Sequence, residues 1–436
     1  MNSKTFCPIP WIFQAARSNG DVRVCCQANV TKNKGVVRKE NGKAFNAGKD
    51  DLSEARNAEM MKQMRLNMLT GVWSEECSRC KSEEDAGLNS RRQYEKEKNM
   101  LSYSSALEIT NADGSINTED VPIKYFDLRF GNFCNLKCRM CGPTDSNEWY
   151  SDWIKLKGNT FKETSGEVEI KQNKSGKLYT DEYNWPDKQI FWSYLEKHAE
   201  NIEYIYFAGG EPMLIEKHYD FLKKCIDWSI ADKISIEYNT NLTTLPNKVL
   251  DLWKHFKAVY VGASIDGIGK VLEYQRHPVK WNKIQKNLAK LDSSSKNIHA
   301  WLASTVTVYN IFHLPEFMKW KLENNFSKIN SGKKKPIITY HVAHTPAHLN
   351  IRVLPNSLKK IAADRLYDFY YWTIDKNYSH NIQEQAKIIA DSITKYMFAE
   401  DYYPDHWNEF KRYTQDLDKI RRECLLDIEP IFKGHV

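Results

Sequence analysis

Residues 123–143 read IKYFDLRFGNFCNLKCRMCGP, a strand-like run that leads directly into a loop with three cysteines. The loop places Cys134, Cys138 and Cys141 at a Cys-x3-Cys-x2-Cys spacing. Thiolates are soft ligands that suit iron–sulfur clusters and zinc. Three of them can hold three irons of a four-iron cluster and leave the fourth iron open for chemistry. A structural zinc site, the alternative, would need a distant fourth ligand, and its loops favour a Cys-x2-Cys spacing.

The chain around this loop alternates strand-like and helix-like stretches. Strand-like runs recur at residues 123–130, 203–209, 233–239, 258–266, 298–308 and 336–343. This alternation predicts a parallel sheet with helices outside it, either as a partial barrel or as an open doubly wound sheet. Active sites of such folds lie at the carboxyl ends of the strands, where the cysteine loop begins.

Composition narrows the class of protein and its compartment. The 436 residues are 41% hydrophobic, enough for two or three domains, and no apolar stretch is long enough to span a membrane. No secretory signal is visible at the N-terminus, so we expect a cytoplasmic protein with no membrane partner. The formal net charge of +7 is mild and dispersed, which does not indicate a nucleic-acid partner. Eight of the ten cysteines precede residue 142, and such clustering in a reducing compartment favours metal over disulfides.

A second motif follows the second strand-like run. Gly209, Gly210, Glu211 and Pro212 form a Gly-Gly-Glu-Pro sequence, which alone would also suit a turn. Glycines allow backbone to approach a ligand closely, and a carboxylate suits an ammonium group. In this order after the cysteines, the two motifs resemble those of the radical S-adenosylmethionine (SAM) superfamily. In that family the GGEP motif contacts the amino group of SAM.

The resemblance extends to the ends of the later strands. Ser264 and Asp266 are similar to the SxDG motif of peptide-modifying members, and they point to the same face of a strand. Met140 stands before the third cysteine, where relatives often carry an aromatic residue that packs near the adenine. By this resemblance, the further residues that contact SAM are Asn239, Asn241, Arg276 and, through its backbone, Val306.

The resemblance implies a fold and a reaction. The fold is α/β, a partial (β/α)6 barrel of the radical SAM type. SAM would chelate the open iron of the [4Fe-4S] cluster, and an external donor such as flavodoxin or ferredoxin would supply an electron. Reductive cleavage of SAM would give a 5′-deoxyadenosyl radical that takes hydrogen from a substrate. We expect a peptide or protein side chain as the substrate. A sugar, nucleotide or other small molecule is the alternative, and a non-catalytic zinc-stabilised interaction module is an alternative of another class.

Four further cysteines lie in the N-terminal region. Cys7, Cys25, Cys77 and Cys80 could close a full shell around a metal centre, and Cys26 could replace Cys25. Their order resembles a twitch (SPASM-like) domain, which would hold an auxiliary [4Fe-4S] cluster; zinc or no metal remain alternatives.

The division into domains follows from these motifs. We expect the twitch-like domain at residues 1–120, the radical SAM core at 121–345 and a helical C-terminal region at 346–436. Within the first, the methionines at helical spacing predict a helix that Ser53 can begin and Gly71 can end.

Overall fold

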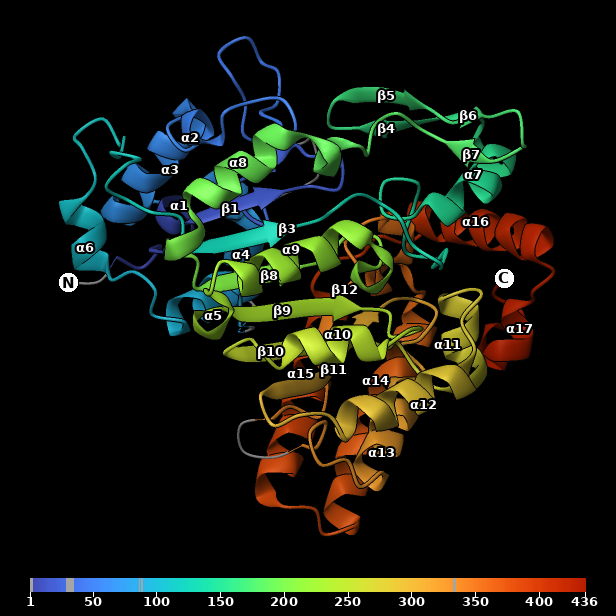
Figure 1. The fold of residues 1–436 in the computed structure, drawn as a ribbon. Helices are drawn as coiled ribbons and strands as arrows, with labels where there is room; N and C mark the ends of the chain where they lie inside the picture. The colour runs from blue at the N-terminus through green and yellow to red at the C-terminus, as the bar shows by residue number, and fades with distance from the viewer. Residues whose placement is uncertain (1–2, 29–34, 86, 88, 332–334) are drawn as a thin grey trace. The chain divides into compact units, whose positions relative to one another are not determined.

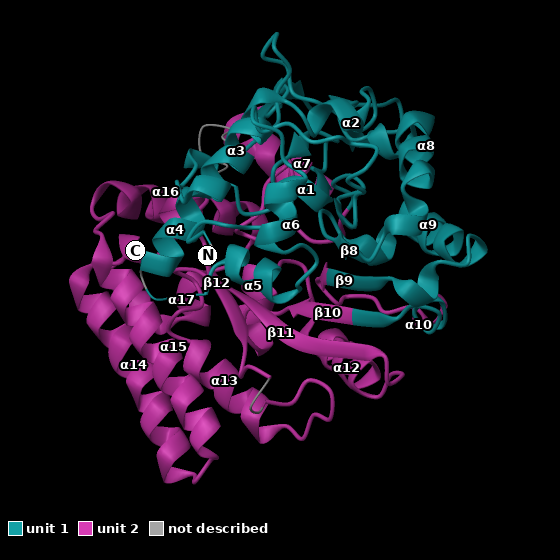
Figure 2. Ribbon diagram, turned by 90° about the vertical axis from the view of Figure 1, so that its left-hand side faces the viewer, with its two compact units in different colours: residues 1–133, 159–238, 251–259 teal, residues 134–158, 239–250, 260–436 magenta. Residues whose placement is uncertain are grey.

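The computed structural model describes residues 3–28, 35–85, 87, 89–331 and 335–436. The chain divides into two compact units (Figure 2). Unit 1 comprises Met1–Phe133, Asn159–Tyr238 and Asp251–Val259. Unit 2 comprises Cys134–Gly158, Asn239–Leu250 and Tyr260–Val436. The boundary passes through strands β9 (Ser235–Thr240) and β10 (Ala258–Ser264), and each unit is described by itself below.

Unit 1 is built on a mainly parallel sheet (Figure 1). Its strands, in spatial order, are β9, β8 (Tyr204–Phe207), β3 (Tyr125–Leu128), β1 (Phe13–Ala16) and β2 (Val22–Arg23). The neighbours from β9 to β1 pair in parallel, and β2 is an antiparallel edge. This confirms the predicted parallel sheet, but β1 and β2 come from the cysteine-rich region, which we had not expected to contribute strands.

The two faces of this sheet differ in character because side chains alternate along each strand. Phe207 packs its ring 5.6 Å from that of Phe221 and 4.9 Å from that of His218, both on α9 (Glu216–Asp227). The register places Asp127, Tyr206 and Glu237 side by side on the opposite face. One face of the sheet is therefore apolar and covered by helices, and the other carries polar and charged groups.

Unit 1 also contains several short helices. The helix predicted from Ser53 to Gly71 is in fact two helices, α2 (Leu52–Ala55) and α3 (Glu59–Thr70), separated by a turn. Gly71 does end α3, in the left-handed conformation that glycine adopts without strain. The other helices of the unit are α1 (Ile9–Ile12), α4 (Ser78–Asp85), α5 (Arg91–Glu97), α6 (Tyr103–Glu108) and α8 (Gln189–Lys197). Two hairpins, β4 (Thr160–Glu163) with β5 (Gly166–Glu169) and β6 (Lys171–Gln172) with β7 (Leu178–Tyr179), complete it.

Unit 2 continues the alternation of strands and helices. Strand β11 (Ile298–Val306) pairs in parallel with β12 (Thr339–Val342), and β10 lies on the other side of β11. The helices are α7 (Tyr150–Lys157), α11 (Gly269–Gln275), α12 (Trp281–Asp292), α13 (Leu314–Glu323), α14 (Asn356–Asp375), α15 (His380–Ala399), α16 (Asp405–Arg421) and α17 (Leu425–Ile428). Helix α10 (Asn247–Trp253) is shared between the units. In the described part of the chain, no helix combines the length and the apolar character needed to cross a bilayer.

One buried histidine of unit 1 gives this fold a predictable pH dependence. His198 is 6% exposed, and burial, together with the charges of Arg56 and Lys197, lowers its pKa to about 4. The unfolded chain takes up this proton near pH 6.5 and the folded chain near pH 4, so stability is full above pH 6.5 and falls as the pH drops toward 4.

We expect this loss to be about 2 kcal/mol, which is less than the full difference between the two pKa values implies. In His198→Phe, which keeps a ring against Tyr194, this loss should disappear from urea unfolding curves measured between pH 4 and 7. The exposed His255 provides the control, since His255→Phe should keep the wild-type dependence. Equal dependence in all three proteins would contradict the prediction.

Candidate functional site

The three-cysteine loop lies in unit 2. Cys134 and Cys138 are buried and Cys141 is half-buried. The thiols of Cys138 and Cys141 share a hydrogen bond, which lowers the pKa of Cys138 and raises that of Cys141. The charge of Arg276 also lowers the pKa of Cys138. The thiolate is the form that binds metal, and the positive charge of Arg276 favours that form at Cys138.

Hydrogen bonds to the backbone fix the path of this loop. The amide of Cys134 donates to Asn147 Oδ1 at 2.8 Å, and the indole of Trp149 donates to the carbonyl of Cys138 at 2.9 Å. Ser146 Oγ donates to the carbonyl of Leu136 at 2.6 Å. The loop is therefore held in shape by the segment that follows it, at the start of α7.

A buried arginine between the second and third cysteines ties the loop to the C-terminal helix. Arg139 is fully buried, and its Nη2 lies 2.5 Å from Asp418 Oδ1 and 2.6 Å from Glu423 Oε2. Its guanidinium stacks 3.5 Å from the ring centroid of Tyr274, and its carbonyl accepts from Tyr413 at 2.8 Å. We had assigned no role to the C-terminal region. The only signal in the sequence was a charged residue inside a loop of thiols.

Asn241 reaches the cysteine loop from the end of β9. Its Nδ2 lies 3.8 Å from Cys134 Sγ and donates to Asn135 Oδ1 at 3.0 Å. Asn239, two residues earlier, is exposed. Of the two predicted SAM-binding asparagines, Asn241 therefore contacts the thiol of Cys134 directly.

Asp266 and Arg276 form a buried pair beside the thiols. Arg276 Nε lies 2.6 Å from Asp266 Oδ2, and its Nη1 lies 4.0 Å from Cys138 Sγ. The other oxygen of Asp266 accepts from the amide of Thr305 at 2.7 Å. Asp266 thus holds Arg276 next to the thiol of Cys138, and the role of both residues in binding SAM stays a prediction.

Ser264, Met140 and Val306 are the other residues of unit 2 that we predict to contact SAM. Ser264 and Met140 are half-buried. The carbonyl of Val306 accepts from the amide of Ala343 at 2.9 Å, a backbone bond that links the ends of β11 and β12. The roles of these three residues in binding SAM stay predictions.

The GGEP motif lies in unit 1, directly after β8. Gly209 and Gly210 have φ values of +75° and +52°, and a Cβ on Gly210 would lie 2.3 Å from the carbonyl oxygen of Phe133. Both positions therefore require glycine. Glu211 is buried, its amide donates to the same carbonyl at 2.8 Å, and its Oε1 accepts from the amide of Met213 at 3.2 Å. Pro212 begins the short turn that follows. A single SAM site that combines this motif with the cysteine loop of unit 2 stays a prediction.

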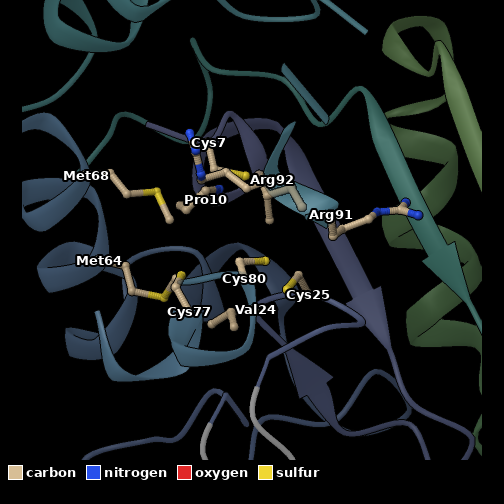
Figure 3. A pocket seen from close by; sticks show the side chains of 11 residues that line it. Cys7, Pro10, Val24, Cys25, Met64, Met68, Cys77, Cys80, Arg91 and Arg92 are labelled. Atoms are coloured by element: carbon tan, nitrogen blue, oxygen red, sulfur yellow. The ribbon is translucent and has the colours of Figure 1, made fainter. Parts of the chain in front are cut away.

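The four N-terminal cysteines line one cavity of unit 1. Figure 3 shows Cys7, Cys25, Cys77 and Cys80 around the same space, with Val24, Met64, Met68 and Pro10 as apolar walls. Cys26 is not among the lining residues, which favours Cys25 as the fourth thiol.

The chemistry of this donor set suits a soft metal centre. Burial is the largest cause that raises the pKa of all four thiols, in Cys77 to about 12. The negative charges of neighbouring thiolates raise these values further, so a bound cation is what would stabilise the ionised forms together. Among the described residues, no three His, Cys, Asp or Glu side chains are arranged as a group that could hold a single metal ion.

The sequence of the central region decides the family of this part of the chain. Residues 128–323, which include the three-cysteine loop and the GGEP motif, match the Radical SAM superfamily. This segment is a radical SAM domain. No curated protein matches the sequence.

Solved structures similar to the chain include SAM-bound proteins. Native anSMEcpe with bound AdoMet is 14% identical, with 59% of this chain and 63% of that chain covered and a TM-score of 0.37. SuiB of Streptococcus suis bound to S-adenosylmethionine is 12% identical, with 79% and 66% covered and a TM-score of 0.34. SuiB bound to its precursor peptide SuiA is 14% identical, with 66% and 62% covered and a TM-score of 0.30. The chain spans less than two thirds of the anSMEcpe chain, and at these TM-scores the likeness carries no argument about function.

Proposed function

We propose that this protein is a radical SAM enzyme whose catalytic [4Fe-4S] cluster is held by Cys134, Cys138 and Cys141. The observation that carries the proposal is a set of three thiols in one anchored loop inside a radical SAM domain. A cluster held by these thiols would supply the electron for reductive cleavage of SAM, the chemistry by which such enzymes take hydrogen from a substrate. The protein supplies the binding sites, orients the reactants and excludes water.

The residues of unit 2 would have distinct roles in this reaction. Asn241 and Arg276 place an amide 3.8 Å from one sulfur and a guanidinium 4.0 Å from another. Hydrogen bonds and positive charge at thiolate sulfurs favour the reduced, more negative state of an iron–sulfur cluster. Asp266 orients Arg276, and Met140, Ser264, Asn239 and Val306 would contact SAM.

In unit 1, the proposed ligand of SAM is the GGEP motif. The close backbone approach at Gly210 leaves no room for a side chain, and Glu211 presents a buried carboxylate for the amino group of SAM. Burial strengthens such an ion pair because little water screens it.

We propose an auxiliary [4Fe-4S] cluster at the four-cysteine cavity. With it we assign residues 1–120 to a twitch-like domain, 121–345 to the core of a partial (β/α)6 barrel and 346–436 to a helical C-terminal region. The proposed substrate is a peptide or protein side chain, the electron donor is flavodoxin or ferredoxin, and the enzyme is cytoplasmic. Modification of a sugar, nucleotide or other small molecule is the second candidate function. It would use the same three thiols of the loop and the same four-cysteine cavity.

Metal content separates the enzyme from a zinc-stabilised interaction module. Protein purified without oxygen should be brown and carry about eight irons, four for each cluster. With SAM and dithionite it should release methionine and 5′-deoxyadenosine. A colourless protein that holds zinc alone and leaves SAM intact would contradict the proposal.

The auxiliary site is tested by its own variants. Cys77→Ala together with Cys80→Ala removes two of the four thiols and should halve the iron content. Cys26→Ala removes a neighbouring thiol that does not line the cavity and should keep all the iron. Iron analysis and visible absorption of the wild type and the two variants show whether the four-cysteine cavity holds a cluster. Equal iron in the wild type and the double variant, or an equal loss in Cys26→Ala, would contradict this assignment.

A further inference from the structure

The two residues that flank Cys138 are held through their backbone groups. The amides of Lys137 and Arg139 donate to the carbonyls of His277 and Gln275, both at 2.8 Å. Buried backbone groups must find hydrogen-bond partners, and each such bond limits how far the chain can move. The position of the Cys138 side chain therefore depends on the groups that bind its two neighbours.

The carbonyls of the same two neighbours are bound from helix α16. Arg421, the last residue of this helix, donates through Nη2 to the carbonyl of Lys137 at 2.7 Å. Tyr413, about two turns earlier, donates to the carbonyl of Arg139 at 2.8 Å. Helix α16 thus holds the backbone directly before and directly after Cys138.

Arg421 shares its carboxylate with a second cation. Its side chain is 1% exposed, and its Nε lies 2.8 Å from Oδ2 of Asp152 on helix α7, which packs against α16. The other carboxylate oxygen of Asp152 lies 2.8 Å from Lys137 Nζ. In the ion pairs of the described residues, one carboxylate therefore serves two cations, and the group keeps one net positive charge.

The guanidinium also covers the tryptophan that binds Cys138. Arg421 Cζ lies 4.8 Å from the centroid of the Trp149 ring, and the face of an indole attracts a cation. The indole in turn donates to the carbonyl of Cys138 at 2.9 Å. Trp149, Asp152 and Cys138 are all buried, so little water screens the charge of Arg421.

We propose that Arg421 is a positioning residue of the cluster site. It holds the Cys138 thiol in place through the carbonyl of Lys137, and it keeps a positive charge beside the loop. A loop that is already ordered binds its ligand more tightly, and positive charge favours the more negative, reduced state of an iron–sulfur cluster. The effect on a cluster rests on the proposed function, whereas the hold on the loop does not.

The hold on the loop is tested by hydrogen exchange of the full chain as purified. Mass spectrometry of peptides that cover residues 134–141 should show exchange about tenfold faster in Arg421→Gln than in the wild type, because a buried hydrogen bond and an ion pair are lost. Arg422→Gln, at the exposed next position, is the matched control and should exchange like the wild type. Equal exchange in all three proteins would overturn the proposal.

The effect of the charge is tested by the reduction potential of the cluster in the Cys77→Ala, Cys80→Ala background. In a redox titration followed by electron paramagnetic resonance, Arg421→Gln should lower the ratio of reduced to oxidised cluster about tenfold, a midpoint about 59 mV more negative. A merely structural role would leave this potential unchanged, and that result would overturn the proposed effect of the charge.

Arg421→Lys separates the two effects. It keeps the charge but lacks the planar fork that reaches both the carbonyl of Lys137 and Asp152. We expect a potential close to that of the wild type, together with fast exchange of residues 134–141. Should Arg421→Gln fail to fold by circular dichroism, Arg421→Lys decides the test, and slow, wild-type exchange in it would overturn the hold on the loop.

Failure of this proposal and failure of the proposed function give different results. A wild type that binds no iron and leaves SAM intact would refute the function, while faster exchange in Arg421→Gln would still support the hold on the loop. A wild type that cleaves SAM, with unchanged exchange and potential in Arg421→Gln, would keep the function and refute the role of Arg421.

Discussion

Replacement of Cys134, Cys138 and Cys141 with alanine should reduce the formation of 5′-deoxyadenosine to background. The physical reason is that these three sulfurs are the proposed attachment of the cluster that reduces SAM, and the chain offers no other group of thiols in that loop. The measurement is chromatography of the products after incubation with SAM and dithionite under anaerobic conditions.

Iron analysis makes this result specific. The triple variant should keep about half of the iron, because the four-cysteine cavity lies in unit 1 and is untouched. Cys424→Ala, at an exposed thiol of unit 2, is the matched control and should keep full activity and all the iron. SAM cleavage at the wild-type rate in the triple variant would refute the assignment of the catalytic loop.

Replacement of Arg139 with methionine should destabilise the protein by about 3–5 kcal/mol, the range measured when one partner of a buried ion pair is removed. Methionine fills a similar volume but leaves Asp418 and Glu423 without the cation that lies 2.5 and 2.6 Å away. The change should appear as a lower midpoint in urea unfolding followed by circular dichroism.

Two further variants test the cause of this loss. Adding Asp418→Asn and Glu423→Gln removes the uncompensated charges and should recover most of the stability. Arg412→Met, at an exposed arginine of the same helix α16, should have little effect. If Arg139→Met unfolds at the wild-type midpoint, or if the two added substitutions recover no stability, Arg139 does not stabilise the protein through Asp418 and Glu423.

Local patterns were enough to predict the elements of the sheet in the central region. Each of the six strand-like runs contains one strand, because β-branched and aromatic residues are frequent in these runs. The strands are β3, β8, β9, β10, β11 and β12. The glycine that ends α3, Gly71, also follows from local chemistry.

What the sequence did not predict depends on contacts between distant residues. Strand β1 has four residues, too few for a periodic signal, and it is stabilised by pairing with β3 more than a hundred residues later. Arg139 and its partner Asp418 are 279 residues apart, so nothing local marks them as a pair.

The most direct test of the central claim is electron paramagnetic resonance of the reduced Cys77→Ala, Cys80→Ala protein, recorded with and without SAM. In this variant only the cluster of the Cys134 loop should remain. Our account predicts the signal of a reduced four-iron cluster whose spectrum changes when SAM is added, because SAM would bind at the iron that no cysteine holds. A spectrum that SAM leaves unchanged, or one that persists after Cys134, Cys138 and Cys141 are also replaced, would contradict it.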